Sequence, residues 1–219
     1  MLNYDEIIAG IDKFKDYDSD TLMSVVSEIG RLNELEVVDS NKIGDREGLK
    51  YLPEGPEGPE VHTPESFKKI YEVVKESGYV GATMPTQYGG GGAPFTTAIL
   101  AGEVGIASNM AFYMGPGLSH GAMKTILKKA TEELKDKYLP NMTSGEWMGT
   151  MCLTEPQCGT DLGLIKTTAK PVDDHYELNG QKIWISFGEH DLTENIIHLV
   201  LARTPDAPAG IKGISLFLV

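Results

Sequence analysis

The spacing of hydrophobic residues divides the chain into an early helical part and a late strand part. From Leu22 to Leu35, apolar side chains recur every three or four positions, which predicts an amphipathic helix with Asp18 or Ser19 as its cap. The predicted helical segments are residues 4–14, 22–35, 65–77, 96–108, 119–129 and 131–139. Residues 1 to about 140 are therefore expected to be mainly helical.

Local signals mark some of the predicted helix ends. Thr63-Pro64-Glu65 combines a capping hydroxyl, a proline for the first turn and an acid near the positive end of the helix dipole. Thr131 is a candidate cap for the last predicted helix, which is expected to end before Pro140.

Two stretches are predicted to be irregular. Residues 39–60 are rich in glycine, proline and acids, and we expect a solvated loop there, because proline removes hydrogen-bond donors and glycine has a high entropic cost of ordering. The second stretch contains four consecutive glycines, Gly89 to Gly92, which indicate backbone freedom or a close approach by another group. A phosphate-binding P-loop is excluded, because Ala93-Pro94-Phe95 follows the glycines in place of Lys-Ser/Thr.

After Trp147 the alternation of apolar and polar residues changes to a period of two, which is typical of strands. Strands are predicted at residues 148–153, 167–172, 196–202 and 214–219, and a hairpin at 176–186. Asn179-Gly180 supplies the turn signal of the hairpin, and its second strand would point Trp184 and Ser186 to the same side. These patterns predict an α+β fold, with an amino-terminal α-helical domain at residues 1–145 and an antiparallel β domain at 146–219.

The last predicted strand still runs at Val219, so we interpret the chain as a fragment with an incomplete β domain. Open strand edges favour pairing with another chain, and a homo-oligomer is expected for the complete protein.

Composition narrows the class of protein. The net charge of −13 would repel a phosphate backbone, so nucleic acid is not an expected partner. Cys152 and Cys158 have neither a disulfide nor a zinc spacing, and the five histidines are scattered, so no metal site is expected. We find no run of about 18 apolar residues to span a membrane, and residues 1–6 do not resemble a secretory signal. A cytoplasmic protein is expected.

The stretch from Met151 to Asp161 starts as an apolar strand and breaks into Thr-Glu-Pro and then Gly-Thr-Asp. Such a break is typical of a strand that runs into a ligand-binding loop.

Several motifs, in the same order along the chain, resemble the amino-terminal half of the acyl-CoA dehydrogenase family. They are Met84-Pro85 with Tyr88-Gly89-Gly90, Tyr138-Leu139-Pro140 with Ser144-Gly145-Glu146, Leu153-Thr154-Glu155-Pro156 with Gly159-Thr160-Asp161, and Gly180 to Ser186. The similarity runs from about residue 35 to the end. The acidic Pro/Gly stretch, Gly188-Glu189-His190-Asp191 and Ala202-Arg203-Thr204-Pro205 resemble a branch that includes 3-methylmercaptopropionyl-CoA dehydrogenase-like enzymes.

The resemblance implies a fold of a helical domain, a β domain and a second helical domain, the last absent from this chain. It implies FAD as cofactor and an acyl-CoA as substrate, which loses a proton from its α-carbon and a hydride from its β-carbon. It further implies that the electrons pass to an electron-transferring flavoprotein. The family's catalytic base is a glutamate of the second helical domain, so no catalytic residue is assigned here and the fragment is expected to be inactive.

The resemblance also implies the site residues. Those that match the family's flavin contacts are Met151, Leu153, Thr154, Trp184, Ile185 and Ser186, and Thr160 matches a position shared between flavin and acyl-CoA. Backbone amides and the Thr154 hydroxyl suit the polar edge of an isoalloxazine ring, and the indole of Trp184 suits its face.

Structural explanations compete with each of these roles. Without the family match, a tryptophan in an alternating strand is more often a core residue than a cofactor contact. The Thr154 hydroxyl could instead satisfy the turn before Pro156, and Glu155 is expected to be a structural acid in place of a catalytic base. The two cysteines are expected to fill the core. Two other functions remain open: an acyl-CoA oxidase of the same fold, and a non-enzymatic helical interaction module.

Overall fold

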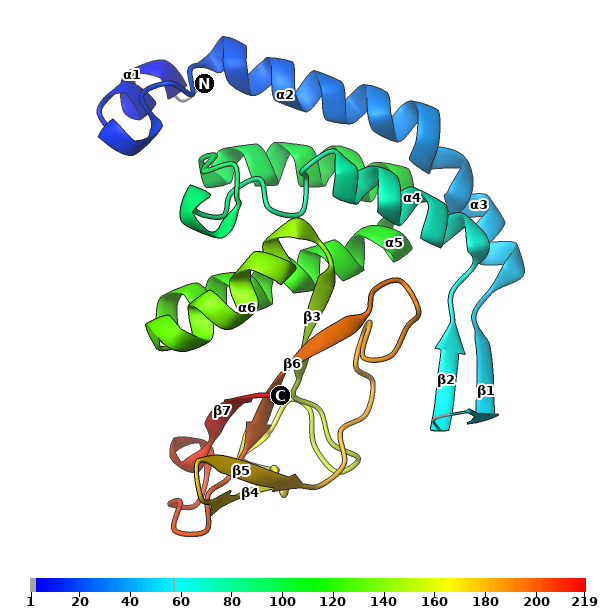
Figure 1. The fold of residues 1–219 in the computed structure, drawn as a ribbon, viewed down its shortest axis with the longest axis vertical. Helices are drawn as coiled ribbons and strands as arrows, with labels where there is room; N and C mark the ends of the chain where they lie inside the picture. The colour runs from blue at the N-terminus through cyan, green and yellow to red at the C-terminus, as the bar shows by residue number, and fades with distance from the viewer. Residues whose placement is uncertain (1–2, 57) are drawn as a thin grey trace.

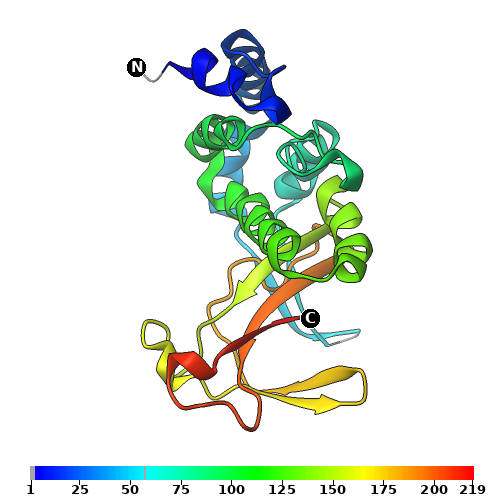
Figure 2. The same ribbon diagram turned by 90° about the vertical axis from the view of Figure 1, so that its left-hand side faces the viewer.

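The computed structural model describes residues 3–56 and 58–219 of the chain. Helices and strands occupy different parts of the molecule: the helices stack in the upper part of Figure 1, and β4, β5 and β7 lie at the bottom. The view in Figure 2 shows the N-terminus at the helical end and the C-terminus among the strands.

The helical part contains six α-helices within the described residues, and one π-helical turn and short 3-10 turns are distributed over both parts. The α-helices are α1 (Tyr4–Ala9), α2 (Ser19–Leu32), α3 (Val38–Glu47), α4 (Glu65–Glu76), α5 (Phe95–Lys129) and α6 (Glu132–Ser144). The turns are η1 (Asp12–Phe14), η2 (Asn33–Val37, the π-helical one), η3 (Thr86–Tyr88), η4 (Leu162–Leu164) and η5 (Ile211–Gly213).

The strands form small sheets. They are β1 (Lys50–Gly55), β2 (Gly58–His62), β3 (Trp147–Cys152), β4 (Thr168–Val172), β5 (His175–Asn179), β6 (Asn195–Ala202) and β7 (Ser215–Leu218). β1–β2, β4–β5 and β6–β7 pair antiparallel, whereas β3 and β6 pair parallel in the sheet β3-β6-β7. The predicted α+β class is confirmed, with one parallel pair in an otherwise antiparallel arrangement. The domain boundary at 145/146, which falls between α6 and β3, stays a prediction.

The core lies between the helices and the upper ends of β3 and β6. Phe112 of α5 is fully buried and meets the rings of Phe67, Tyr71 and Tyr113 edge-to-face, at centroid distances of 5.7, 6.4 and 5.2 Å. Edge-to-face pairs of this kind add to the free energy gained from burial alone. They join α4 to α5, and Met148 of β3 belongs to the same core, from which the site segments project.

The face of α2 follows the predicted period, and Asp18 caps it by accepting a hydrogen bond from the Thr21 amide (2.8 Å). The prediction fails at Leu35, which is 65% exposed, whereas Asn33 and Val37 are buried. The π turn η2 is the cause, because an extra residue in one turn rotates every following side chain around the axis.

The expectation of a loop without helix at residues 39–60 is wrong. The segment continues as α3 and then forms the β1–β2 hairpin; Glu57, in the same predicted loop, lies outside the described residues. Local propensity is overridden by packing, since Gly44 of α3 leaves room for the ring of Phe67, which a Cβ would approach to 2.6 Å.

Two predicted helix ends need correction. α4 does start at Glu65, but the Thr63 hydroxyl does not cap it, because that hydroxyl donates to Asp191 (2.7 Å). α6 does not end before Pro140: it continues to Ser144 and ends at Gly145 with φ +85°. Burial of Leu139 and Met142 compensates for the hydrogen bond that proline removes. The cap at Thr131 is confirmed by its bond from the Leu134 amide.

The two helices predicted at 96–108 and 119–129 are one run, α5, broken only at Asn109 (φ −156°, ψ 89°). By length and composition α5 is the one described helix able to cross a membrane, contrary to the expectation of no such stretch. A core helix meets the same criterion, and α5 packs against α2, α3, α6 and β3.

The glycine run makes the close approach that was predicted. A Cβ on Gly90 would stand 2.1 Å from the Met84 carbonyl oxygen, and Gly89 has φ +83°. The predicted hairpin at 176–186, by contrast, is wrong. β5 pairs with β4 across Asp173-Asp174, and Asp173 has φ +49°. Gly180 lies against Thr167, where a Cβ would come within 2.3 Å of its hydroxyl oxygen, so the chain turns away there.

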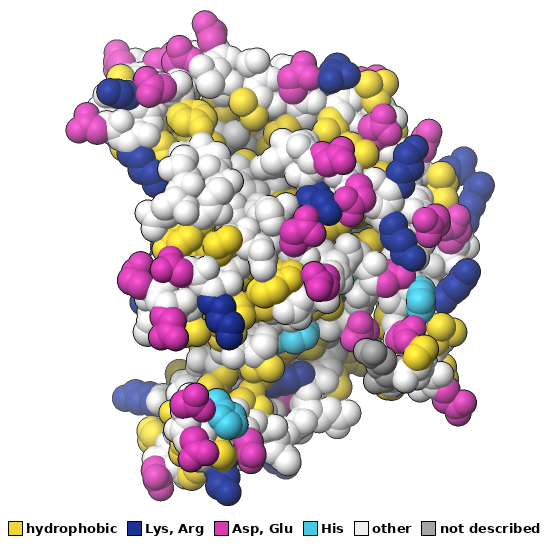
Figure 3. All heavy atoms as spheres, in the orientation of Figure 1, with side chains coloured by type: hydrophobic (Ala, Val, Ile, Leu, Met, Phe, Trp, Pro, Cys, Tyr) yellow, Lys and Arg dark blue, Asp and Glu magenta, His cyan; other side chains and the backbone are white. Residues whose placement is uncertain are grey.

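Acidic and basic side chains are interleaved over the face shown in Figure 3. The excess of acids is therefore spread over this face and does not form a single acidic patch.

Candidate functional site

The two stretches predicted to contact a cofactor, residues 151–154 and 184–186, belong to segments that lie side by side, residues 150–154 and 182–186. Three contacts run between them: the Thr150 hydroxyl donates to the Ser186 carbonyl (2.7 Å), the Ile183 amide to the Thr154 carbonyl (2.9 Å), and the Lys182 ammonium to the Leu153 carbonyl (3.1 Å). The Thr150–Ser186 and Thr154–Ile183 contacts show that the segments run antiparallel, and the long Lys182 side chain reaches back to Leu153. Six of the seven predicted site residues are brought together in this way.

Trp184 is the most exposed large apolar side chain among the described residues, at 85%. Its φ of +58° is rare for a bulky residue. Residues 181–186 therefore do not form a regular strand, and the argument that Trp184 and Ser186 share a strand face is wrong. The competing expectation of a core tryptophan is wrong too. An indole held open to solvent in a strained backbone is an arrangement that fits a ring-shaped ligand.

Polar groups suited to a ligand lie on the two segments and on the loop that follows residue 154. The hydroxyls of Thr154, Thr160 and Ser186 make no hydrogen bond within the described part of the chain. The Thr154 hydroxyl thus does not satisfy the turn before Pro156. Among the strands of the described residues, β3 pairs with β6 alone, so its other edge carries no second strand there. Hydroxyls, edge amides and an open aromatic face together fit the polar edge and apolar face of a flavin.

The remaining predicted residues differ in position. Met151, Leu153 and Ile185 are half-buried, and Met151 packs against the core. Thr160 lies exposed on the following loop, and no hydrogen bond within the described residues joins it to the other six. Its predicted place between flavin and substrate stays a prediction.

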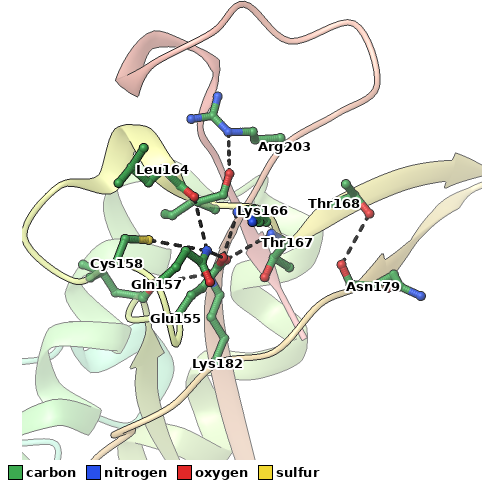
Figure 4. Close-up of polar contacts among 12 residues, drawn as sticks. Glu155, Gln157, Cys158, Leu164, Lys166, Thr167, Thr168, Asn179, Lys182 and Arg203 are labelled. Atoms are coloured by element: carbon green, nitrogen blue, oxygen red, sulfur yellow. Dashed lines mark hydrogen bonds and ion pairs between the residues drawn. The ribbon is translucent and has the colours of Figure 1, made fainter.

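A buried carboxylate holds together the segments that form the site. Glu155 is 3% exposed and accepts bonds from the amides of Lys166 (2.7 Å) and Thr167 (3.1 Å) and from the Lys182 ammonium (2.8 Å). Figure 4 shows the side chains of Glu155, Gln157 and Lys182 converging. Burial alone would raise the pKa of Glu155, but the bonds from Lys182, Thr167 and Lys166 outweigh it and lower the pKa to about 2. Its expected structural role fits this geometry.

Arg203, at the end of β6, holds the loop that carries Thr160. Its guanidinium donates to four backbone carbonyls, those of Gly163, Ile165, Pro208 and Gly210, at 2.8–3.2 Å. Neither role, that of Arg203 or that of Lys182, was predicted from the sequence. A cationic residue directly before the apolar pair Ile183-Trp184 was the available signal for Lys182, because a lysine that is buried with such neighbours needs a partner.

A second carboxylate ties the site segment to the helical part. Asp191 accepts from the Thr63 amide (2.9 Å) and hydroxyl (2.7 Å) and pairs with Lys68 (2.8 Å) and His62 (3.2 Å). Burial opposes ionisation, but the bonds from Lys68 and Thr63 prevail and lower the pKa of Asp191 to about 2. The segment from Ser186 to Asp191 is thereby anchored at both ends.

A cavity of about 380 Å³ adjoins this segment. Ser186 and Phe187 form one wall, Ala111 and Met114 of α5 another, and Phe67 of α4 a third. The Phe187 ring lies directly over Gly115 of α5, where a Cβ would come within 2.6 Å of it.

Both cysteines are buried, which agrees with the expected role in the core. Burial raises the pKa of the Cys152 thiol, whose sulfur lies 3.5 Å from Nδ1 of His198.

Comparison with known proteins matches the helical part and the strand part of the chain to two different domain models. Residues 56–146 match the acyl-CoA dehydrogenase N-terminal domain, and residues 150–219 match the acyl-CoA dehydrogenase middle domain. The chain is 38% identical over 213 residues to 3-methylmercaptopropionyl-CoA dehydrogenase of Ruegeria pomeroyi, covering 97% of this chain and 35% of that protein. It is 39% identical over 215 residues to a butyryl-CoA dehydrogenase of Syntrophomonas wolfei, covering 95% and 34%.

The fold is similar to that of an acyl-CoA dehydrogenase from Geobacillus kaustophilus. The TM-score is 0.75 at 25% identity, over 93% of this chain and 48% of the other. The chain spans about a third of the length of the curated relatives it matches.

Proposed function

This chain belongs to the acyl-CoA dehydrogenase family, and from that premise we propose that it contributes the flavin-facing half of an enzyme that dehydrogenates an acyl-CoA thioester between its α- and β-carbons. The observation that carries the proposal is the antiparallel course of residues 150–154 and 182–186, which leaves Trp184 exposed on the segment of Ser186; among the described residues, the hydroxyls of Ser186 and Thr154 have no hydrogen-bond partner.

FAD is the proposed cofactor. The residues that would hold it are Met151, Leu153, Thr154, Trp184, Ile185 and Ser186. Amides of the first segment and the Thr154 hydroxyl would bind the polar edge of the ring, and the Trp184 indole would cover one face and exclude water from it. When bound, FAD supplies the acceptor for the hydride that leaves the β-carbon of the substrate.

Thr160 is proposed to contact the acyl-CoA from the loop that Arg203 holds in place. The proton of the α-carbon requires a base within hydrogen-bond reach. Glu155 is unsuited to that task, because its oxygens accept bonds from Lys182, Lys166 and Thr167. We propose that the base comes from a part of the protein outside these 219 residues.

The partners proposed for the whole protein are an acyl-CoA, an electron-transferring flavoprotein as electron acceptor, and further copies of itself, in the cytoplasm. The relatives named as dehydrogenases support a dehydrogenase over an acyl-CoA oxidase. The open indole supports a cofactor site over a simple interaction module, which has no need of it.

The test measures flavin absorbance and oxygen uptake of the whole protein, which includes the proposed base, with FAD and butyryl-CoA. A flavin spectrum that changes on addition of butyryl-CoA, without oxygen uptake, is expected. Protein that never perturbs the FAD spectrum would contradict the proposal, and rapid oxygen uptake would favour the oxidase. The variant Trp184→Ala should weaken flavin binding, whereas Tyr176→Ala, an exposed aromatic of β5, should not.

A further inference from the structure

We propose that Lys182 is a positioning residue for the flavin-facing segment: by joining Glu155 to the Leu153 carbonyl, its ammonium sets where Trp184 and Ser186 stand relative to residues 151–154. The inference rests on the proposed function, because it assigns a role to a residue that does not itself touch the cofactor.

The contacts of Lys182 give its end a single position. The ammonium lies 2.8 Å from Oε1 of Glu155 and 3.1 Å from the Leu153 carbonyl oxygen. The two side chains are only 11% and 2% exposed. A buried ammonium is strongly penalised unless it keeps its partners, so the segment at residue 182 has little freedom to shift.

The partner of Lys182 is itself fixed to the backbone. Glu155 accepts from two consecutive amides, those of Lys166 and Thr167, and pairs through its own amide and carbonyl with Cys158 (2.8 and 3.0 Å). The carboxylate therefore does not follow the lysine if the segment moves. Because Glu155 is fixed in this way, it determines where the Lys182 side chain lies.

The backbone conformation of Trp184, two residues after Lys182, depends on where Lys182 is held. Packing does not hold its indole, which is 85% exposed. Its backbone is nevertheless in a strained conformation, with φ +58°. A strained backbone persists only when its neighbours determine it. Here the neighbours are Lys182 and Ile183 on one side and the Ser186 carbonyl, bonded to Thr150, on the other.

A purely structural ion pair would affect folding stability alone. A positioning residue would also change the surroundings of Trp184 in protein that remains folded. The sequence helps here, because it contains two tryptophans, so Trp147→Phe leaves Trp184 as the single reporter.

The experiment compares Lys182→Met, Lys182→Arg and Lys170→Met in the Trp147→Phe background. Lys170 is an exposed lysine of β4 and serves as the matched control. The readouts are the indole N–H resonance and fluorescence of Trp184 without cofactor, and the affinity for FAD. We expect Lys182→Met to shift the indole signal and to weaken FAD binding roughly tenfold, or about 1.4 kcal/mol. Lys182→Arg should restore much of both, and Lys170→Met should match the parent.

If Lys182→Met does not fold, the double variant Glu155→Gln with Lys182→Met replaces it. That variant buries no unpaired charge, and its one amide oxygen can still accept from the Lys166 or the Thr167 amide, but it lacks the contact to Leu153. It should show the same shifted indole and weakened FAD binding.

A folded Lys182→Met protein with the parent's indole signal and FAD affinity, altered only in melting temperature, would overturn the inference. Failure of the parent protein itself to bind FAD would overturn the proposed function instead. The indole signal alone would then decide whether Lys182 positions Trp184.

Discussion

At the scale of single residues, Glu155 makes the stability of the protein depend on pH. Its pKa is about 2 in the folded protein, against 4.5 for an ordinary glutamate. The unfolded state therefore binds more protons between these values, so the stabilisation is complete above about pH 4.5 and is lost as the pH falls through 2. Glu155→Gln should lower the free energy of unfolding by about 3 kcal/mol at pH 7. Urea unfolding from pH 7 to 3 should show this difference shrinking below pH 4.5.

The exposed residue Glu177 of β5 provides the control. Glu177→Gln should change stability little and equally at every pH. A Glu155→Gln penalty that stays the same from pH 7 to 3 would show that the carboxylate is not held ionised by its partners.

Substitution of Gly115 tests whether the Phe187 ring packs directly against this glycine of α5. A methyl group on Gly115 would stand 2.6 Å from the Phe187 ring, so Gly115→Ala should destabilise the protein by about 1–3 kcal/mol. Gly121→Ala, in the same helix, meets nothing within 4 Å and should stabilise it by about 0.5–1 kcal/mol. Denaturant unfolding measures both, and equal stabilities for the two variants would mean that Phe187 does not occupy this position.

At the scale of elements, the break in α5 has a definite cause. Asn109 is fully buried, its Oδ1 accepts from the Phe112 amide (3.1 Å), and its Nδ2 donates to the Ser40 hydroxyl (2.8 Å). The first bond is an N-cap for the second half of α5, and the second ties it to α3. Asn109→Ala should cost about 2 kcal/mol, the loss of a cap and a buried hydrogen bond.

Asn141→Ala in α6 is the matched substitution, because the Asn141 side chain makes no hydrogen bond within the described residues. Thermal unfolding should separate the two variants. A fall in melting temperature no larger for Asn109→Ala than for Asn141→Ala would remove the cap as the reason for the break.

Which elements could be predicted depends on what determines them. The face of α4, with Phe67, Ile70, Tyr71 and Val74 buried, follows from its own period. α3 and the end of α6 could not be predicted, because distant contacts there outweigh glycine and proline. The hairpin at Asn179-Gly180 failed for the same reason, since Thr167 leaves no room beside Gly180.

The same distinction holds for the candidate site. Motif order located residues 151–154 and 184–186, but spacing carried no information on the exposed, strained Trp184 or on Lys182, Asp191 and Arg203. Those depend on contacts between residues up to 128 positions apart, such as Thr63 with Asp191. Periodicity along one element is blind to such contacts.

At the scale of the whole molecule, these 219 residues span about a third of the curated relatives they match, and we predict that they do not turn over an acyl-CoA alone. Glu155 and Asp191, the carboxylates bonded into the site, both have a pKa of about 2 and are paired with lysines. A carboxylate of so low a pKa is a poor base toward a carbon acid.

The measurement mixes the protein with FAD, butyryl-CoA and an artificial electron acceptor, with the butyryl-CoA dehydrogenase of Syntrophomonas wolfei as the active control. No steady reduction of the acceptor is expected. Steady turnover would place a base within this chain, and the variants Glu155→Gln, Asp191→Asn and Glu189→Gln would then identify it. Glu189 belongs in that set because it lines the cavity beside Ser186. If turnover survives all three substitutions, the base that removes the α-proton is none of these three carboxylates.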